Sequence, residues 1–179
     1  KFAEHKDFTG NMGAVLDAMS SIDSNATEVL IIQGDDCVFL DEKELRKMLE
    51  EYEMLQPDIS IMLTKHTDRN RTRFILNDSK KVVEIRKREE GDDTLGLFVN
   101  GVFIFSVQII KEYLEKIKDK NEDNADKEKE VGIIDFIVEE FKDGRSIFGF
   151  ESKQPWIEVN TNVQLKKARD FVARRKFMS

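Results

Sequence analysis

Cysteine is almost absent from this sequence, and long apolar runs are missing altogether. The single cysteine, Cys37, has no second cysteine with which to form an internal disulfide, which fits a reducing compartment, and we expect a cytoplasmic protein. No apolar stretch approaches the roughly 20 residues that a membrane-spanning helix needs, and the amino end does not resemble a signal peptide. These absences argue against a secreted or membrane-embedded class of protein, and we expect no membrane partner.

A surplus of positive charge is also missing. The chain of 179 residues has 36 acidic and 29 basic residues and a formal net charge of -7. A protein that binds nucleic acid needs a basic face to contact the phosphates, and this acidic composition does not indicate one. We therefore expect no nucleic-acid partner. The hydrophobic share of 40% suits one globular domain. The first residue is Lys1 rather than Met, so one explanation is a fragment or a processed product of a longer protein.

The apolar pattern predicts alternating strands and helices. Apolar residues at helical spacing predict helices over 10–21, 41–55, 107–117, 131–141 and 161–177. Short apolar or alternating runs predict strands over 28–33, 58–66, 73–76, 80–86, 95–105 and 146–150. The charge-rich residues 118–130 predict a mobile loop. This order favours a three-layer α/β fold with a mixed sheet.

The most informative stretch is V-L-I-I-Q-G-D-D, residues 29–36. An apolar run ended by glycine predicts a strand buried on both faces, as in a parallel sheet. Ligands of open α/β sheets sit at the carboxyl ends of such strands, where Asp35 and Asp36 would hold a metal ion against a phosphate. Glycine and aspartate are also turn residues, so a plain turn is an equally good interpretation of this stretch alone.

Two further stretches carry small or amide residues at positions that a ligand can reach. Gly10, Asn11 and Gly13 lie at the amino end of the predicted helix 10–21, where free backbone N–H groups can meet a base or a phosphate. A plain helix start with small packing residues is the simpler interpretation. Asn100 and Gly101 interrupt the apolar strand 95–105, which predicts a bulge or a close approach of another backbone.

Taken together, four stretches resemble the sugar-1-phosphate nucleotidylyltransferases. Residues 10–18, G-N-M-G-A-V-L-D-A, resemble the family's G-T-x-x-A-V-x-x-A, and residues 29–35 resemble its strand ending in Gly-Asp. Residues 99–105, V-N-G-V-F-I-F, resemble N-x-G-I-Y-V-F, and residues 156–165, W-I-E-V-N-T-N-V-Q-L, resemble W-x-x-V-N-T-x-x-Q-L. The similarity is greatest to the uridylyltransferase domain of the N-acetylglucosamine-1-phosphate enzymes.

The resemblance implies a Rossmann-like enzyme that joins a nucleotide, expected to be UTP, to a sugar 1-phosphate and releases pyrophosphate. It implies a magnesium ion held by Asp35 and Asn160, since a hard cation prefers oxygen ligands. The positions that match the family's nucleotide site are His5, Gly10, Asn11 and Gly34, and those nearest its sugar site are Lys87 and Asn100. Asp36 matches no family role.

Departures from the family motifs limit what the resemblance implies. The family's phosphate-binding loop, G-x-G-T-x-M followed by P-K, has no counterpart in these residues. We therefore expect this chain alone to be inactive and the missing piece to come from a second segment or a longer parent chain. On the resemblance, residues 1–160 form a nucleotidylyltransferase domain that is incomplete at its amino end, and 161–179 form a carboxyl-terminal arm helix.

The sugar pocket departs further from the family, because its Glu falls near Lys87 and its N-x-G asparagine falls on Val99. A pocket built for hydroxyls rejects sugars that leave its polar groups unpaired, so N-acetylglucosamine 1-phosphate itself is in doubt. Two alternatives follow. One is a non-catalytic relative that keeps the fold for binding or regulation. The other is a nucleotidylyltransferase for a different phosphorylated alcohol or an acidic sugar, which Lys87 would suit.

Overall fold

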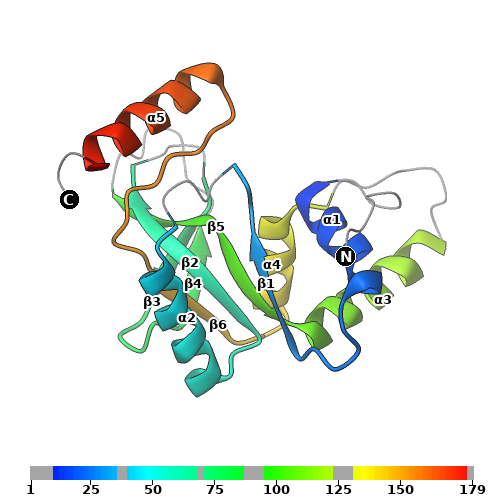
Figure 1. The fold of residues 1–179 in the computed structure, drawn as a ribbon. Helices are drawn as coiled ribbons and strands as arrows, with labels where there is room; N and C mark the ends of the chain where they lie inside the picture. The colour runs from blue at the N-terminus through cyan, green and yellow to red at the C-terminus, as the bar shows by residue number, and fades with distance from the viewer. Residues whose placement is uncertain (1–9, 36–39, 68–70, 87–94, 123–130, 177–179) are drawn as a thin grey trace.

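The computed structural model describes residues 10–35, 40–67, 71–86, 95–122 and 131–176 (Figure 1). The strands are β1 (Glu28–Ile32), β2 (Ile59–His66), β3 (Arg73–Leu76), β4 (Val82–Arg86), β5 (Gly96–Ser106) and β6 (Ile147–Glu151). The helices are α1 (Gly10–Ala18) with the 3-10 turn η1 (Met19–Ser21), α2 (Glu42–Leu55), α3 (Val107–Glu122), α4 (Ile133–Lys142) and α5 (Asn162–Lys176). Within these residues, no helix combines the length and apolar character needed to cross a membrane.

A mixed six-stranded sheet forms the middle layer. The strand order is β4-β3-β5-β2-β6, and β1 pairs with β5 beside that path. Strand β5 runs antiparallel to β1, β2 and β3, whereas β2 and β6 are parallel. Helix α2 covers one face through Met48 and Tyr52, and α1, α3 and α4 cover the other (Figure 1). The predicted three-layer α/β fold with a mixed sheet is confirmed.

The predicted environment of β1 is wrong, although the strand itself is confirmed. β1 pairs antiparallel with residues 102–106 of β5, not within a parallel pair. Leu30 is 40% exposed and Ile32 is 41% exposed, so the strand is not buried on both faces by the described residues. An apolar run indicates that the side chains of a strand are to be buried, but it does not indicate which segment of the protein buries them.

Helix α3 extends further than its apolar periodicity predicts. Residues 118–122 are helical, so the predicted loop 118–130 is wrong over that part, and 123–130 lie outside the described residues. The predicted bulge in β5 is confirmed. The register between β2 and β5 shifts between Ile61 and Leu63, opposite Asn100 and Gly101, and Gly101 adopts a φ of 84° that glycine allows.

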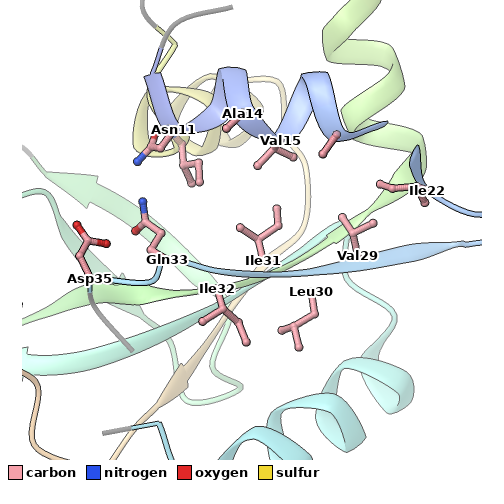
Figure 2. Close-up of a pocket in the computed structure, with 12 residues that line it drawn as sticks. Asn11, Ala14, Val15, Ile22, Val29, Leu30, Ile31, Ile32, Gln33 and Asp35 are labelled. Carbon is pink, nitrogen blue, oxygen red and sulfur yellow. Dashed lines mark hydrogen bonds between the residues drawn. The ribbon is translucent and has the colours of Figure 1, made fainter. Parts of the chain in front are cut away.

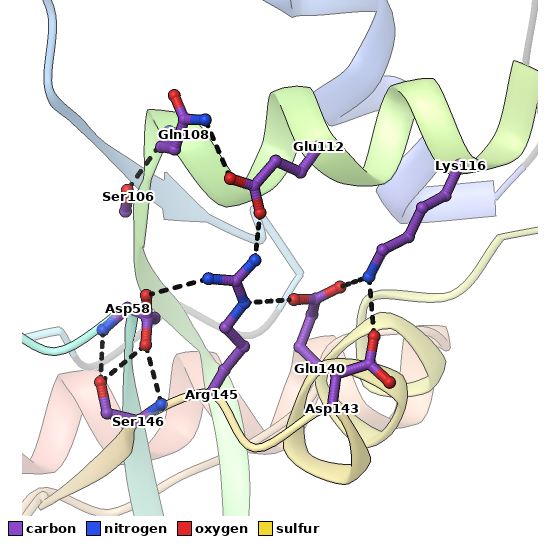
Figure 3. A network of polar contacts seen from close by, with 9 residues as sticks. All are labelled: Asp58, Ser106, Gln108, Glu112, Lys116, Glu140, Asp143, Arg145 and Ser146. Atoms are coloured by element: carbon purple, nitrogen blue, oxygen red, sulfur yellow. Dashed lines mark hydrogen bonds and ion pairs between the residues drawn. The ribbon is translucent and has the colours of Figure 1, made fainter.

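A polar network ties α3, α4 and the starts of β2 and β6 together (Figure 3). Glu140, 1% exposed, pairs with Lys116 at 3.1 Å and with Arg145 at 3.3 Å. Arg145 also pairs with Glu112 and lies 3.9 Å from a carboxylate oxygen of Asp58. The hydrogen bond that Lys116 donates to the Asp143 carboxylate is the main cause that raises the pKa of Lys116. Each buried charge in this network therefore has an opposite charge beside it.

Candidate functional site

An apolar groove of about 650 Å³ lies between α1 and β1 (Figure 2). Its apolar lining comes from one side of α1, from Ile22 and from β1, and includes Ala14, Val15, Ala18, Val29 and Ile31. Asn11, Gln33 and Asp35 line the same end of the groove, so its polar groups gather where β1 ends (Figure 2). The groove thus has an apolar length and one polar mouth.

The segment that carries Asn160 meets the polar mouth through Val159, which contacts Asp35. The backbone N–H of Val159 donates to the backbone carbonyl of Asp35 at 2.9 Å, which places Asn160 in the next position along the chain. The N–H of Asn160 donates to the side-chain oxygen of Gln164 at 3.0 Å. Gln164 and Thr161 form a capping box at the start of α5, with Gln164 N–H bonded to the Thr161 hydroxyl at 3.2 Å.

These two residues fit a magnesium ion by the chemistry of their side chains. The carboxylate of Asp35 and the amide oxygen of Asn160 are hard oxygen donors, and both residues are exposed. No group of three or more His, Cys, Asp or Glu residues is placed to hold a metal among the described residues. A cation here would therefore take most of its ligands from water and from substrate phosphate, as Mg²⁺ commonly does.

The predicted nucleotide-binding residues divide between the groove and the fold. Gly10 begins α1 with a φ of 82°, which favours glycine at that position. Asn11 lines the groove, but its side-chain oxygen accepts the N–H of Ile133 at 2.7 Å and so caps α4. Gly34 is exposed, and a Cβ at that position would meet no atom within 4 Å. Among these residues, the side-chain oxygen of Asn11 therefore stabilises the fold through its hydrogen bond to Ile133.

Asn100 is the described member of the predicted sugar-binding pair. It is 9% exposed, and its side-chain oxygen is buried without a hydrogen-bond partner among the described residues. The next residue, Gly101, accepts the N–H of Gln33 at 2.8 Å, so Asn100 lies beside the end of β1. His5, Asp36 and Lys87 lie outside the described residues.

Two residues near this end of the sheet, Gln33 and Arg71, were not anticipated from the sequence. Gln33 lines the polar mouth, and its position as the one polar residue between the apolar strand and Gly34 was the available signal. Arg71 forms an ion pair with Glu158 and stacks on the ring of Trp156, with its guanidinium carbon 4.4 Å from the ring centroid. Nothing in the local sequence around Arg71 indicates these contacts, because they join segments that are far apart in the chain.

Curated relatives confirm the sequence resemblance at low identity. The chain is 26% identical over 158 residues to a glucose-1-phosphate adenylyltransferase of Lachnospira eligens, a match that covers 86% of this chain and 35% of the relative. It is 27% identical over 172 residues to the bifunctional protein GlmU of Campylobacter lari, with 93% of this chain and 37% of the relative covered. The chain is similar to sugar-1-phosphate nucleotidyltransferases. It spans a little over a third of the length of these relatives, and no protein-family model matches it.

Solved structures confirm the fold. A putative glucose-1-phosphate thymidylyltransferase from Bacillus anthracis matches with a TM-score of 0.69 and 18% identity, over 93% of this chain and 62% of the other. HddC from Yersinia pseudotuberculosis, complexed with GMP-PN, matches with a TM-score of 0.64 and 20% identity, over 94% of this chain and 64% of the other. The chain therefore has the Rossmann-like fold of nucleotidyltransferases.

Proposed function

We propose that this chain is the larger part of a nucleotidyltransferase domain that transfers a nucleotidyl group from a nucleoside triphosphate to a sugar 1-phosphate. The observation that carries the proposal is the hydrogen bond from Val159 to Asp35, because it joins the two stretches whose Asp and Asn are candidate ligands for magnesium. The curated relatives named as adenylyltransferase and GlmU support the reaction class. UTP is the nucleotide that the resemblance favours.

The proposed reaction is an in-line displacement. An oxygen of the sugar phosphate forms a bond to the α-phosphorus of the triphosphate, and the bond from that phosphorus to the bridging oxygen breaks. Pyrophosphate leaves with the electron pair, and no protein base is needed because the attacking phosphate oxygen already carries charge. Bound magnesium would neutralise phosphate charge at this step. Asp35 and Asn160 would hold the ion, and positioning would supply the rest of the catalysis.

We also propose that a segment outside the described residues completes the site by pairing with β1. Within the described residues β1 has a strand partner on one side alone, which is β5. The exposed side chains of Leu30 and Ile32, which also line the apolar groove, suit an extended strand with apolar side chains. A phosphate-binding loop at the end of that strand would lie at the polar mouth, beside Asp35.

Pyrophosphate release tests the proposed function. The parent protein, with any segments beyond this chain, is incubated with Mg²⁺, each nucleoside triphosphate and a panel of sugar 1-phosphates. We expect one pair to be favoured, and Asp35→Asn to reduce turnover at least 100-fold without a change of melting temperature. Unchanged turnover in Asp35→Asn would contradict the metal assignment.

A non-catalytic binding protein of the same fold is the second candidate. The observation that favours it is the use of the Asn11 oxygen as a cap for α4, which removes one group that could recognise a base. No release of pyrophosphate with any pair, together with measurable binding of a nucleotide or a sugar phosphate, would favour this candidate over the enzyme.

A further inference from the structure

The segment that carries Asn160 has no regular secondary structure. Residues 152–160, here called the strap, connect β6 to α5 and run across the sheet end from β2 toward β1 (Figure 1). The strap begins at Ser152, whose N–H donates to the carbonyl of Leu63 at 2.8 Å. Glu44, in the first turn of α2, accepts the N–H of Lys153 at 2.8 Å. The strap ends at the Val159 contact with Asp35, so the position of Asn160 depends on how the strap is held.

Side chains hold the strap between these two anchors. Arg71, just before β3, contacts two strap residues on the same side, forming an ion pair with Glu158 and stacking on Trp156 at 4.4 Å. His66, at the end of β2, meets the Trp156 ring edge-on at a centroid distance of 5.5 Å. Arg71 and Glu158 are 23% and 27% exposed, so their attraction is only partly screened by water. One guanidinium therefore fixes the strap immediately before Val159 and Asn160.

The indole of Trp156 is held by packing. Its ring nitrogen is buried and has no hydrogen-bond partner among the described residues. A buried donor without a partner is costly, so other contacts of the ring must offset that cost. These are the Arg71 cation over the ring and the T-shaped contact with His66. Removing the Arg71 side chain would release both Glu158 and the ring, because the two contacts share one guanidinium.

We infer that Arg71 and Trp156 are positioning residues that hold Asn160 against Asp35 at the candidate metal centre. Neither residue is placed as a metal ligand. They act through the strap, as the supporting residues around a metal site orient the ligands themselves. This inference rests on the proposed metal site, and its test separates the two claims.

The test is a double-mutant cycle read by Mn²⁺ binding, measured by electron paramagnetic resonance on the intact chain. We expect Arg71→Ala and Asn160→Ala each to weaken Mn²⁺ binding about tenfold, a usual effect of disturbing the support of a metal ligand. The double variant should be no weaker than either single variant, because Asn160 is already displaced when Arg71 is absent. The matched control is Arg46→Ala, which removes an exposed ion pair with Glu42 and should not alter the affinity.

Each outcome of the cycle has one meaning. If Asp35→Asn leaves Mn²⁺ binding unchanged, the proposed metal site is wrong. If Asp35→Asn abolishes binding while Arg71→Ala binds like the unmodified chain, the metal site stands and the inference is overturned. Multiplied losses in the double variant also overturn it, because a general loss of stability would produce them.

A second pair of variants covers the case in which Arg71→Ala does not fold. Trp156→Phe keeps a flat aromatic face for Arg71, whereas Trp156→Leu does not. We expect Trp156→Leu to weaken Mn²⁺ binding about fivefold and Trp156→Phe to stay within about twofold of the unmodified chain. Equal affinities in Trp156→Leu and the unmodified chain would overturn the positioning role.

Discussion

The polar groups at the two ends of the central sheet differ in how they are paired. At the start of β2, Glu140, Arg145 and their neighbours form a network in which every buried charge meets a partner (Figure 3). At the end of β1, the side-chain oxygen of Asn100 is buried and has no hydrogen-bond partner in the part of the chain that the structure describes. Asp35 is exposed beside an open groove (Figure 2). The first arrangement is what stability favours, and the second leaves polar groups available to a ligand.

The largest effect on stability is expected in the paired network. Glu140→Gln removes the carboxylate shared by Lys116 and Arg145 and leaves two cations with one partner fewer. We expect the free energy of unfolding to fall by about 3 kcal/mol, measured by urea denaturation. The control is Glu151→Gln, which breaks the exposed pair with Lys65 and should cost less than about 1 kcal/mol. Similar losses in the two variants would contradict the contrast between buried and exposed pairs.

The same network should give the protein part of its acid sensitivity. The hydrogen bond from Gln108 lowers the pKa of Glu112, burial opposes that shift, and the Arg145 charge adds to the lowering. Because the folded pKa lies below the ordinary value of 4.5, the stabilisation is present above pH 4.5 and is lost as the pH falls through the folded pKa. Melting temperatures measured between about pH 5 and pH 3 should fall less steeply in Glu112→Gln. An unchanged slope would show that Glu112 carries none of the acid sensitivity.

At the open end, removing a polar group should cost little stability. Asn100→Leu replaces a buried oxygen, which no described residue bonds, with an apolar group of similar size, so the unfolding free energy should stay within about 1 kcal/mol or rise. Ser152→Ala is the matched comparison, because Ser152 is also buried but bonds Glu44 and Gln154, and it should lose about 1 kcal/mol. A larger loss in Asn100→Leu than in Ser152→Ala would show that Asn100 serves the fold.

The smallest effect is expected at the exposed face of β1. Ile32→Lys changes a side chain that is 41% exposed, and the unfolding free energy of this chain should change by less than about 0.5 kcal/mol. In a parent protein whose additional strand covers β1, the same change should lower the melting temperature by several degrees, because a lysine would then be buried. Equal melting shifts in the two proteins would contradict the completing strand.

Local patterns in the sequence predict most of the fold but not the surroundings of β1. The periodicity of Met48 and Tyr52 predicts α2 and its buried face, and Asn100-Gly101 predicts the bulge. The environment of β1 could not be predicted, because V-L-I-I is equally apolar with one strand partner or two. For the candidate site, the resemblance paired Asp35 with Asn160, and the Val159 contact places them at the same end of the sheet.

Local sequence patterns could not predict side-chain contacts between residues that are far apart in the sequence. Arg71 reaches Glu158 and Trp156 only after β3 and the strap have been brought together by folding, and neither residue type at those positions predicts the other. Asn11 had a plausible ligand role in the sequence, yet its oxygen bonds Ile133 because α1 and α4 meet on one face of the sheet. Long-range polar pairing therefore decides which side chains stay available at the site.

The most direct test of the account is the Mn²⁺ affinity of Asp35→Asn, measured by electron paramagnetic resonance together with the free energy of unfolding. The account predicts a loss of affinity of at least tenfold with the unfolding free energy unchanged within about 0.5 kcal/mol, since Asp35 is exposed and is proposed to bind the metal. Unchanged Mn²⁺ affinity, with the variant folded as the original chain is, would contradict the claim that the open end of the sheet is a metal-dependent nucleotidyltransferase site.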